Sequence, residues 1–500
     1  MCQSDPGISP PVPFVNSDVP DQRITTLVDA EVGATGDYVL YWMTAYRRTG
    51  ANYALQRAAD WSRHLGVPLV VLVALRLDYP WANDRIHAFA IDGIIDVVEA
   101  LGNRHIVCVP YIEPEPGAGK GLLRRLSAPA AVVVGDDAPV FFLPAARQAA
   151  AAQIECRFEI IDHNGVVPMS VTDRDFKRAV DLRRFYQTIL LDHLEDGPDH
   201  DPLGGLDASR PNVIDQIMID YPTARLARDV ITELDLDHEV PIAPLRGGQT
   251  AARTRLAEFV ASGLGRYDQR NHPAEHAESG LSPYLHFGHI SVHEVLAAVI
   301  AAEQWTPAEV APKATGSRTG WWGMSEQGEG FLDQIVTWRD IGYRAAYYSP
   351  VYDQYEALPG WARRTLEQHA ADPRPYLYSP DQLARSETHD EVWNAAQTQL
   401  TETGTMHNYL RMLWGKKILE WSPHPRIAHT VMMDLNNRYA LDGRDPNSVS
   451  GIHWVLGRFD RAWGPEREIF GKVRYMTSDS TRRKLKLQSY LAQYQPTLRG

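Results

Sequence analysis

The sequence of 500 residues is poor in cysteine, with only Cys2, Cys108 and Cys156. Three cysteines cannot build a disulfide framework, and their spacing matches no familiar metal site. Cys108 and Cys156 lie in apolar runs typical of strands, so we expect buried thiols. This usage argues against a disulfide-stapled secreted domain and predicts the reducing cytoplasm as the compartment.

Long apolar runs and a signal peptide are also missing, so we expect neither a membrane span nor secretion. The formal net charge is −13, which argues against indiscriminate binding to nucleic acids but leaves room for a local basic groove. The GxGxxG fingerprint of dinucleotide-binding folds is absent. No Ser/His/Asp triad or metal-ligand cluster stands out, and no metal site is predicted.

The first part of the chain has the pattern of an α/β domain. Residues 1–30, rich in Pro, Asp and Ser, are expected to form a flexible tail. Within residues 31–168, strands are predicted at 37–43, 67–75, 105–112, 130–136 and 158–162, with helices at 52–65 and 86–101. This alternation favours a doubly wound, Rossmann-like parallel sheet, and the lack of polar alternation fits strands covered on both faces.

Residues 169–255 are expected to link this domain to an all-α domain at 256–500. Helices are predicted there at residues 331–348, 406–421 and 427–441. Gly404 is placed to end the helix that carries Trp393. The loop at 442–447 combines two carboxylates, an arginine and an asparagine, and burying it is costly unless a polar ligand is held there.

Tryptophans concentrate in the second half of this helical part. Five of the thirteen lie between residues 389 and 463, namely Trp393, Trp414, Trp421, Trp454 and Trp463. Trp414 and Trp421 are seven residues apart and therefore share a helical face. Taken alone, such aromatic residues are more often core packing than redox groups, so their spacing leaves both interpretations open.

Longer segments of the sequence are more specific. They are LSPYLHFG (281–288), LPGWAR (358–363), THDEVWNA (388–395), KKILEW (416–421), NNRYALDGRDPN (436–447) and DRAWG (460–464). Together these segments resemble class II cyclobutane pyrimidine dimer photolyases of the photolyase/cryptochrome family. A weaker similarity extends over roughly residues 37 to 490.

The resemblance implies an antenna-type α/β domain followed by a helical FAD-binding catalytic domain, in a monomer that acts on damaged DNA. The implied activity is light-driven repair of cyclobutane pyrimidine dimers, by electron transfer from photoexcited, reduced FAD to a dimer flipped out of the DNA. An antenna chromophore, either a deazaflavin or a folate, is a further expectation. Each of these statements comes from the resemblance and not from composition or spacing.

The resemblance also assigns residues to FAD. The expected contacts are Tyr267, Ser279, Leu281, Ser282, Trp338, Arg339, Arg411, Asn436, Asp442, Gly443 and Asn447. Asn436 would face flavin N5, and Arg411 would pair with Asp442 beside the flavin ring. Ser282 is expected to cap a helix with Pro283 at its first position, whose N-terminus would suit the flavin pyrophosphate. A plain capped helix is the alternative.

Electron supply and substrate binding are assigned in the same way. Trp414, Trp393 and Trp421 would relay electrons, with Trp414 nearest the flavin and Trp421 outermost. The expected substrate contacts are Arg270, Asn271, Gln334, Trp338, Met412, Trp454, Arg461 and Trp463, with Lys472 and Arg474 as further candidates. The basic segment 482–486 would add phosphate contacts, although a solvated helix face is an equal alternative.

The sequence departs from the family pattern at Gln334, where the family has a carboxylic acid. An amide can donate a hydrogen bond to a dimer carbonyl but cannot give up a proton. Further departures, His289, Asn408, Leu413 and Phe459, fall mostly on the expected substrate side. Two alternatives to dimer repair therefore remain, a cryptochrome-like blue-light flavoprotein and a photolyase-like flavoenzyme for another substrate.

Overall fold

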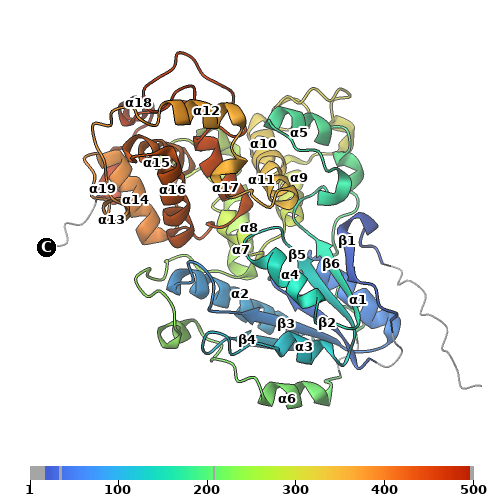
Figure 1. Ribbon diagram of the computed structural model, residues 1–500. Coiled ribbons are helices and arrows are strands. Elements are labelled where there is room, and N and C mark those ends of the chain that lie inside the picture. Colours follow the sequence, from blue (N-terminus) through green and yellow to red (C-terminus); the bar gives the residue numbers. More distant parts are fainter. Residues whose placement is uncertain (1–16, 33–35, 207–208, 496–500) are drawn as a thin grey trace, which may run out of the picture.

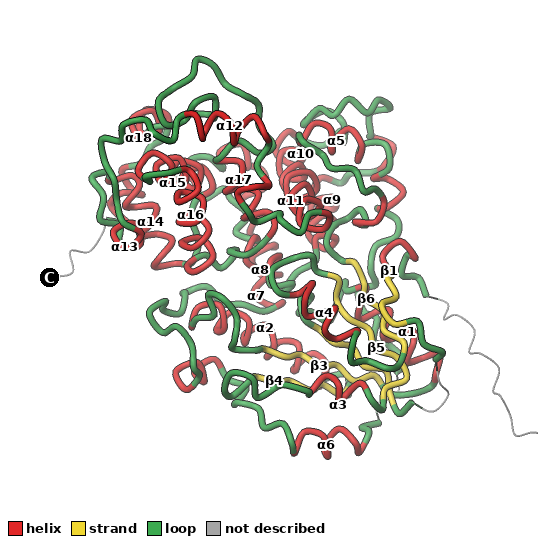
Figure 2. The backbone as a smooth tube through the Cα atoms, viewed as in Figure 1, coloured by secondary structure: helices red, strands yellow, loops and turns green. Residues whose placement is uncertain are grey.

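The computed structural model describes residues 17–32, 36–206 and 209–495. An α/β layer and a larger helical part lie against each other, with α7 (Gln249–Glu258) and α8 (Ser282–His286) between them (Figure 1). Among the described residues, strands occur only in the first part of the chain (Figure 2). This arrangement confirms the predicted fold class, an α/β domain followed by an all-α domain.

The α/β layer is built on a sheet with strand order β1-β6-β5-β2-β3-β4. The strands are β1 (Ile24–Val28), β2 (Tyr38–Met43), β3 (Leu69–Leu75), β4 (Val107–Ile112), β5 (Ala130–Asp137) and β6 (Arg157–Asp162). Strands β2 to β6 pair in parallel, as a doubly wound sheet requires. All five predicted strands are present.

Both faces of the sheet are buried. Val39 and Tyr41 pack into the core under α1 (Tyr53–Leu65) and α2 (Asp84–Gly102), whereas Leu40 packs into a second core on the opposite face. That second core is covered by α3 (Leu122–Ser127), α4 (Leu143–Ala151) and α6 (Asn212–Ile219). Burial on both faces is the physical reason why the strands show no polar alternation.

The edge strand β1 differs from the expected flexible tail. Ile24–Val28 pairs antiparallel with β6, and the buried guanidinium of Arg23 donates hydrogen bonds to the carbonyls of Asp162 and Gly165, both at 3.2 Å. Pro, Asp and Ser dominate the composition of this stretch and hide the short β-branched run of Ile24–Val28. Residues 1–16 of the expected tail lie outside the described residues.

Residues 169–255 contain more structure than the expected linker. Besides α6 and α7, they form α5 (Ala179–Tyr186), which packs against the helical part. The hydroxyl of Tyr186 donates a hydrogen bond of 2.9 Å to Asp340 Oδ2 there. The segment therefore contacts both domains instead of only connecting them.

The helical part confirms the helices predicted from the sequence. Its elements after α8 are α9 (Val292–Glu303), α10 (Glu326–Leu332), α11 (Arg339–Tyr348), α12 (Gly360–Gln368), α13 (Pro380–Ala384), α14 (Glu391–Thr403), α15 (Asn408–Trp421), α16 (Pro425–Tyr439), α17 (Pro446–Val455), α18 (Ser478–Lys484) and α19 (Gln488–Gln493). Gly404 ends α14 in the left-handed conformation, with a φ of 74°. None of the described helices combines the length and apolar character needed to cross a membrane.

Candidate functional site

Three elements that are distant in the sequence meet at Asp442, which follows α16. Arg411 on α15 makes a bidentate ion pair with this carboxylate, with Nη2–Oδ1 at 2.9 Å and Nη1–Oδ2 at 3.2 Å. The hydroxyl of Ser282 on α8 donates a further hydrogen bond of 2.8 Å to Oδ2. The structure thus contains the expected Arg411–Asp442 pair and adds Ser282 to it.

This use of Ser282 corrects the expectation that it caps a helix. Leu281 precedes the first turn of α8, Ser282 is the first residue of that helix, and no side chain caps it. The Ser282 hydroxyl is directed at Asp442 instead of the backbone N–H groups of α8. The local Ser-Pro pattern predicted the helix start correctly to within one residue, but a contact 160 residues away decides the role of the hydroxyl.

The loop after α16 is shaped by close backbone packing. A Cβ atom at Gly443 would lie 2.7 Å from the carbonyl oxygen of Asn436 and 2.9 Å from that of Ala440, so only glycine fits. Arg444 follows with a φ of 66°, and its N–H donates a hydrogen bond of 2.8 Å to Asn437 Oδ1. Gly443 therefore fixes the turn that presents Asp442.

Asn436 lies in the last turn of α16 and is 2% exposed. Its side-chain amide donates to Ser448 Oγ at 2.8 Å and to Asn437 Oδ1 at 3.2 Å. Both amide hydrogens are therefore used within the protein. Among the described residues its carbonyl oxygen accepts no hydrogen bond, which leaves an oriented acceptor for a ligand.

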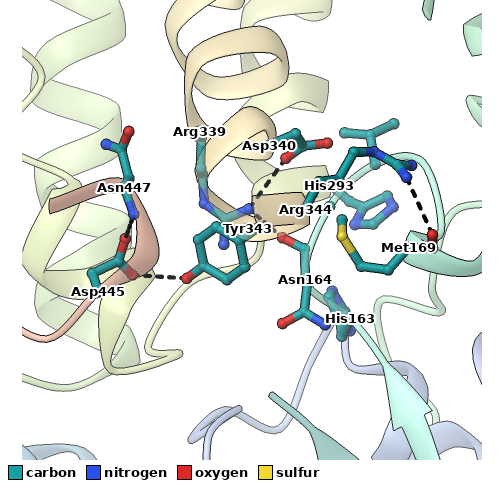
Figure 3. Close-up of polar contacts among 12 residues, drawn as sticks. His163, Asn164, Met169, His293, Arg339, Asp340, Tyr343, Arg344, Asp445 and Asn447 are labelled. Carbon is teal, nitrogen blue, oxygen red and sulfur yellow. Dashed lines mark hydrogen bonds and ion pairs between the residues drawn. The ribbon is translucent and has the colours of Figure 1, made fainter. Parts of the chain in front are cut away.

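Asp445 holds the far end of the same loop. Burial alone raises its pKa, but hydrogen bonds from His286 and Tyr343 and the charge of Arg339 bring the pKa of Asp445 below its usual value. Tyr343 donates to Oδ2 at 2.8 Å, and the N–H of Asn447 donates to Oδ1 at 2.8 Å (Figure 3). Asp445 thus stays ionised and caps the N-terminus of α17.

Among the described residues, Arg339 makes no hydrogen bond or ion pair with Arg411 or Asp442. Its guanidinium donates to the backbone carbonyl of Asn164 at the end of β6 and lies 3.5 Å from Asp340 Oδ1 (Figure 3). It also lies over the ring of Tyr343, at 3.9 Å from the ring centroid. Arg339, which was expected at FAD, therefore joins the helical domain to the α/β domain, because the carbonyl that accepts from its buried guanidinium belongs to Asn164.

The three tryptophans of the expected relay form a continuous buried group. The indole N–H of Trp393 on α14 donates to the carbonyl of Trp414 on α15 at 3.0 Å, and the Trp414 indole donates to Gln397 Oε1 at 2.8 Å. The rings of Trp393 and Trp421 lie 5.6 Å apart at 70°. Trp421, expected as the outermost member, is 1% exposed and does not reach the surface.

Gln334 and Trp338 share a π-helical turn, Asp333–Trp338, that joins α10 to α11. Both side chains are half-buried, and the amide of Gln334 makes no hydrogen bond to any residue that the structure describes. Such turns occur frequently at functional sites because the extra residue redirects the side chains. The turn is anchored by a bidentate ion pair between Asp333 and Arg183, at 2.8 and 3.1 Å.

Cations alternate with indoles on the expected DNA side. The guanidinium of Arg474 lies 5.5 Å from the ring centroid of Trp454 and 4.8 Å from that of Trp463, and Arg461 lies 4.5 Å from Trp463. The Nζ atom of Lys416 lies 5.6 Å from the Trp454 ring, and burial lowers the pKa of Lys416 to about 7. Flat rings with flanking cations are suited to a single-stranded or flipped-out nucleic acid.

The other expected contacts are distributed around these groups. Tyr267 and Leu281 are buried, and Arg270 folds over the Tyr267 ring at 4.6 Å from its centroid. Ser279 and Met412 are half-buried, whereas Asn271 and Asn447 are exposed. Lys472 is 3.5 Å from Glu466 Oε1, and Arg482 pairs with Glu391 at 2.8 Å.

The structure also contains a cavity that the sequence patterns did not predict. It has a volume of about 260 Å³ and lies between the α/β layer and α8, α9, α11 and the loop after α16. Its cations are Arg47, Arg48, Arg76, Arg339 and Arg444, and its large aromatic residues include Trp42, Tyr79, Phe141 and Phe142. Arg47 and Arg48 follow shortly after the first predicted strand in the sequence.

Individual nitrogen atoms of three of these guanidinium groups lack partners. The Nε of Arg47, the Nη2 of Arg48 and the Nη2 of Arg444 are buried and bond to none of the described residues. Burial lowers the pKa of Arg48 and of Arg444 to about 10. Unpaired buried donors are costly, so the cavity is suited to an anionic ligand with an aromatic ring.

Comparisons with known proteins place this architecture. A scan against protein-family models found no match. A deoxyribodipyrimidine photo-lyase from Methanothermobacter thermautotrophicus is 35% identical over 483 residues, covering 94% of this chain and 97% of that protein. A class III photolyase from Agrobacterium tumefaciens has a TM-score of 0.66 at 17% identity, over 93% of this chain and 88% of that chain.

An archaeal photolyase from Sulfolobus tokodaii, solved with two FAD molecules, has a TM-score of 0.56 at 14% identity over 86% of each chain. The two structures show a shared fold. The photo-lyase from Methanothermobacter thermautotrophicus is similar to this chain along almost its entire length. This chain also holds the Arg411–Asp442 pair and the buried tryptophans. The chain therefore belongs to the deoxyribodipyrimidine photo-lyase family.

Proposed function

We propose that this protein binds FAD and uses light to split cyclobutane pyrimidine dimers in DNA, as a class II member of its family. The observation that carries this proposal is the similarity to a deoxyribodipyrimidine photo-lyase over nearly the whole chain. The Arg411–Asp442–Ser282 cluster and the buried tryptophan group support it from the geometry. We further propose that the protein acts as a monomer in the cytoplasm, where the thiols of Cys108 and Cys156, which are unpaired in the structure, would stay reduced.

The polar groups around Asp442 fit a flavin. Bound FAD would supply the electron that the dimer needs to split. The free carbonyl oxygen of Asn436 is an acceptor for the N5–H group of a reduced flavin and would favour the reduced form. Arg411 and Asp442 would hold fixed charges beside the ring, where a buried ion pair tunes a cofactor more than it stabilises the fold.

The substrate would be held by the indoles and cations on the DNA side. Trp338 and Trp454 would sandwich the flipped bases, each stack contributing about 1–3 kcal/mol. Arg461 and Arg474 would bind phosphates while resting on Trp463. Gln334 would donate its unused amide hydrogens to a dimer carbonyl as charge develops there.

The arginine-lined cavity would hold the antenna chromophore, a deazaflavin or a folate. Both classes combine an aromatic ring with acidic groups, and the cavity combines aromatic walls with unpaired guanidinium donors. The site lies beyond the carboxyl ends of β2, β3 and β5, where parallel sheets commonly bind ligands. Replacement of Arg47 and Arg48 by glutamine should abolish binding of an added deazaflavin or folate, measured by fluorescence titration.

The deciding experiment is a repair assay. Reduced, FAD-loaded protein is mixed with an oligonucleotide that contains a thymine dimer, under near-ultraviolet or blue light and in darkness. We expect recovery of intact thymines only in the light. If FAD is bound and photoreduced but no dimer is split, either the light-sensor alternative or a flavoenzyme for another substrate replaces repair, and Gln334 is the residue that favours these alternatives.

A further inference from the structure

The end of the tryptophan group is covered by other aromatic rings. Trp421 is 1% exposed, and the ring of Tyr378 packs against it with centroids 5.3 Å apart at 75°. The imidazole of His389 contacts the same indole at 5.4 Å and 62°. Trp421 is therefore covered by Tyr378, which is half-buried, and by His389, which is exposed.

Tyr378 and His389 are joined by a short hydrogen bond. Tyr378 Oη lies 2.6 Å from His389 Nδ1, and the backbone N–H of His389 donates to the same Oη at 3.1 Å. In the tautomer of His389 that carries its proton on Nε2, the phenolic proton of Tyr378 points at Nδ1 while Oη accepts from the backbone N–H. The pair is thus arranged with tyrosine as donor and histidine as acceptor.

Exposure to solvent increases from Trp421 through Tyr378 to His389. Trp421 is buried, Tyr378 is half-buried and His389 is exposed. The backbone N–H of Tyr378 donates to the carbonyl of Trp421 at 3.4 Å, which ties the covering segment to the end of α15. The exposed ring of Tyr376 stacks on His389 at 3.9 Å and 26°, but its hydroxyl bonds to none of the described residues.

We propose that Tyr378 and His389 form the terminal, proton-coupled electron donor of the tryptophan relay. This inference rests on the proposed function, since light must first oxidise the relay. One electron passes from Tyr378 to the oxidised indole of Trp421 and restores it to the neutral form. At the same time the O–H bond of Tyr378 breaks, and its proton forms an N–H bond at His389 Nδ1.

The products are a neutral tyrosyl radical and a protonated imidazole. An external thiolate then supplies one electron, and the proton returns from His389, so that Tyr378 is a phenol again. An oxidised phenol is strongly acidic and loses its electron readily only where a base takes the proton. His389 is exposed, so water solvates the resulting positive charge at little cost.

The test uses the full-length, FAD-loaded protein with oxidised flavin, excited by a laser pulse and followed by transient absorption and electron paramagnetic resonance. We expect a tyrosyl radical in the wild-type protein. Tyr378→Phe should show only tryptophan radicals that recombine faster. Tyrosine oxidation in the wild-type protein should be slower in heavy water, because a proton moves with the electron. His389→Gln should slow tyrosine oxidation by about 100-fold, the usual effect of removing a positioned base, and should abolish this isotope effect.

Tyr376→Phe is the matched control. Tyr376 lies two residues from Tyr378, and its hydroxyl bonds to none of the described residues, so this variant should leave the radical unchanged. Flavin content and circular dichroism establish that each variant is folded. Tryptophan radicals without any tyrosyl signal in the wild-type protein would overturn this inference and leave the relay intact. If no radicals of either kind form in FAD-loaded protein, the relay fails together with this inference, whereas dimer repair by protein reduced beforehand is decided separately by the repair assay.

Discussion

At the scale of single residues, the site depends on side chains that satisfy one another. Asp442 receives Arg411 and Ser282 from two other helices, and the side chains of Arg411 and Asp442 are both 14% exposed. Removing one partner of such a buried pair leaves the other charge uncompensated. Each member therefore matters more than its individual contact energy suggests.

We predict that Asp442→Ala destabilises the protein by about 3 kcal/mol and lowers its flavin content, because Arg411 is left buried without its partner. Urea unfolding and the ratio of flavin to protein absorbance measure the two effects. Glu387→Ala, which breaks the exposed pair with Arg385, serves as control and should change neither quantity. Equal unfolding free energies and equal flavin contents in Asp442→Ala and Glu387→Ala would contradict the assignment of Asp442 to the flavin site.

A second prediction concerns Gln334. Gln334→Glu should raise the yield of dimer repair per absorbed photon, because a carboxylic acid donates a proton as well as a hydrogen bond. Gln334→Leu should lower the yield several-fold, since it removes a hydrogen bond of about 1 kcal/mol. Flavin content should be equal in all three proteins. A repair yield that is the same in both variants as in the wild-type protein would place Gln334 outside the substrate pocket.

At the scale of elements, close helix packing sets the shape of the flavin region. Gly415 lies in the middle of α15, and a Cβ atom there would lie 2.9 Å from Val455 Cγ2 on α17 and 3.1 Å from Met432 Sδ on α16. Glycine in a helix interior is intrinsically unfavourable, so its presence here reflects the close approach of three helices. These are the helices that carry Arg411 and Asn436.

We predict that Gly415→Ala destabilises the protein by about 1 kcal/mol, because overpacking against Val455 exceeds the gain in helix propensity. Gly330→Ala on α10 is the matched control, since the nearest atom to its added Cβ lies 3.9 Å away. That variant should be neutral or slightly more stable. Thermal unfolding of both proteins gives the comparison, and a stabilised Gly415→Ala would show that the helices can separate.

At the scale of the whole molecule, buried histidines in both domains resist protonation. Burial lowers the pKa of His87 and of His429 to about 4. It also brings the pKa values of further histidines well below the usual value, namely those of His163, His289, His293 and His453. The folded protein therefore holds these side chains neutral where the unfolded chain would protonate them.

Stability should consequently fall as the pH is lowered from about 6.5 towards 4, because in that range the unfolded chain binds more protons than the folded one. Asp137 and Asp340, whose burial raises each pKa to about 6, act in the opposite direction over part of the range. The histidines outnumber them. Calorimetry at pH 7.5, 6.5 and 5.5 should show an unfolding temperature that falls with pH, with the larger drop between 6.5 and 5.5, and a flat profile would contradict neutral burial.

Much of the fold could be predicted from the sequence because its signals are local. Continuous apolar runs predicted the five parallel strands, and Gly404 predicted the end of α14. The spacing of Trp414 and Trp421 placed both on one face of α15. β1 was missed because a five-residue edge strand inside a Pro- and Asp-rich stretch has almost no local signal.

The sequence by itself determined most of the elements, the family and, through the family resemblance, the Arg411–Asp442 pair, since periodicity and long sequence segments need no tertiary information. Only the tertiary structure decided that Arg339 reaches Asn164, that five arginines share one cavity and that Tyr378 covers Trp421. These contacts join residues far apart in the chain. A buried donor or ring takes whichever partner packing brings to it, and no local pattern records that choice.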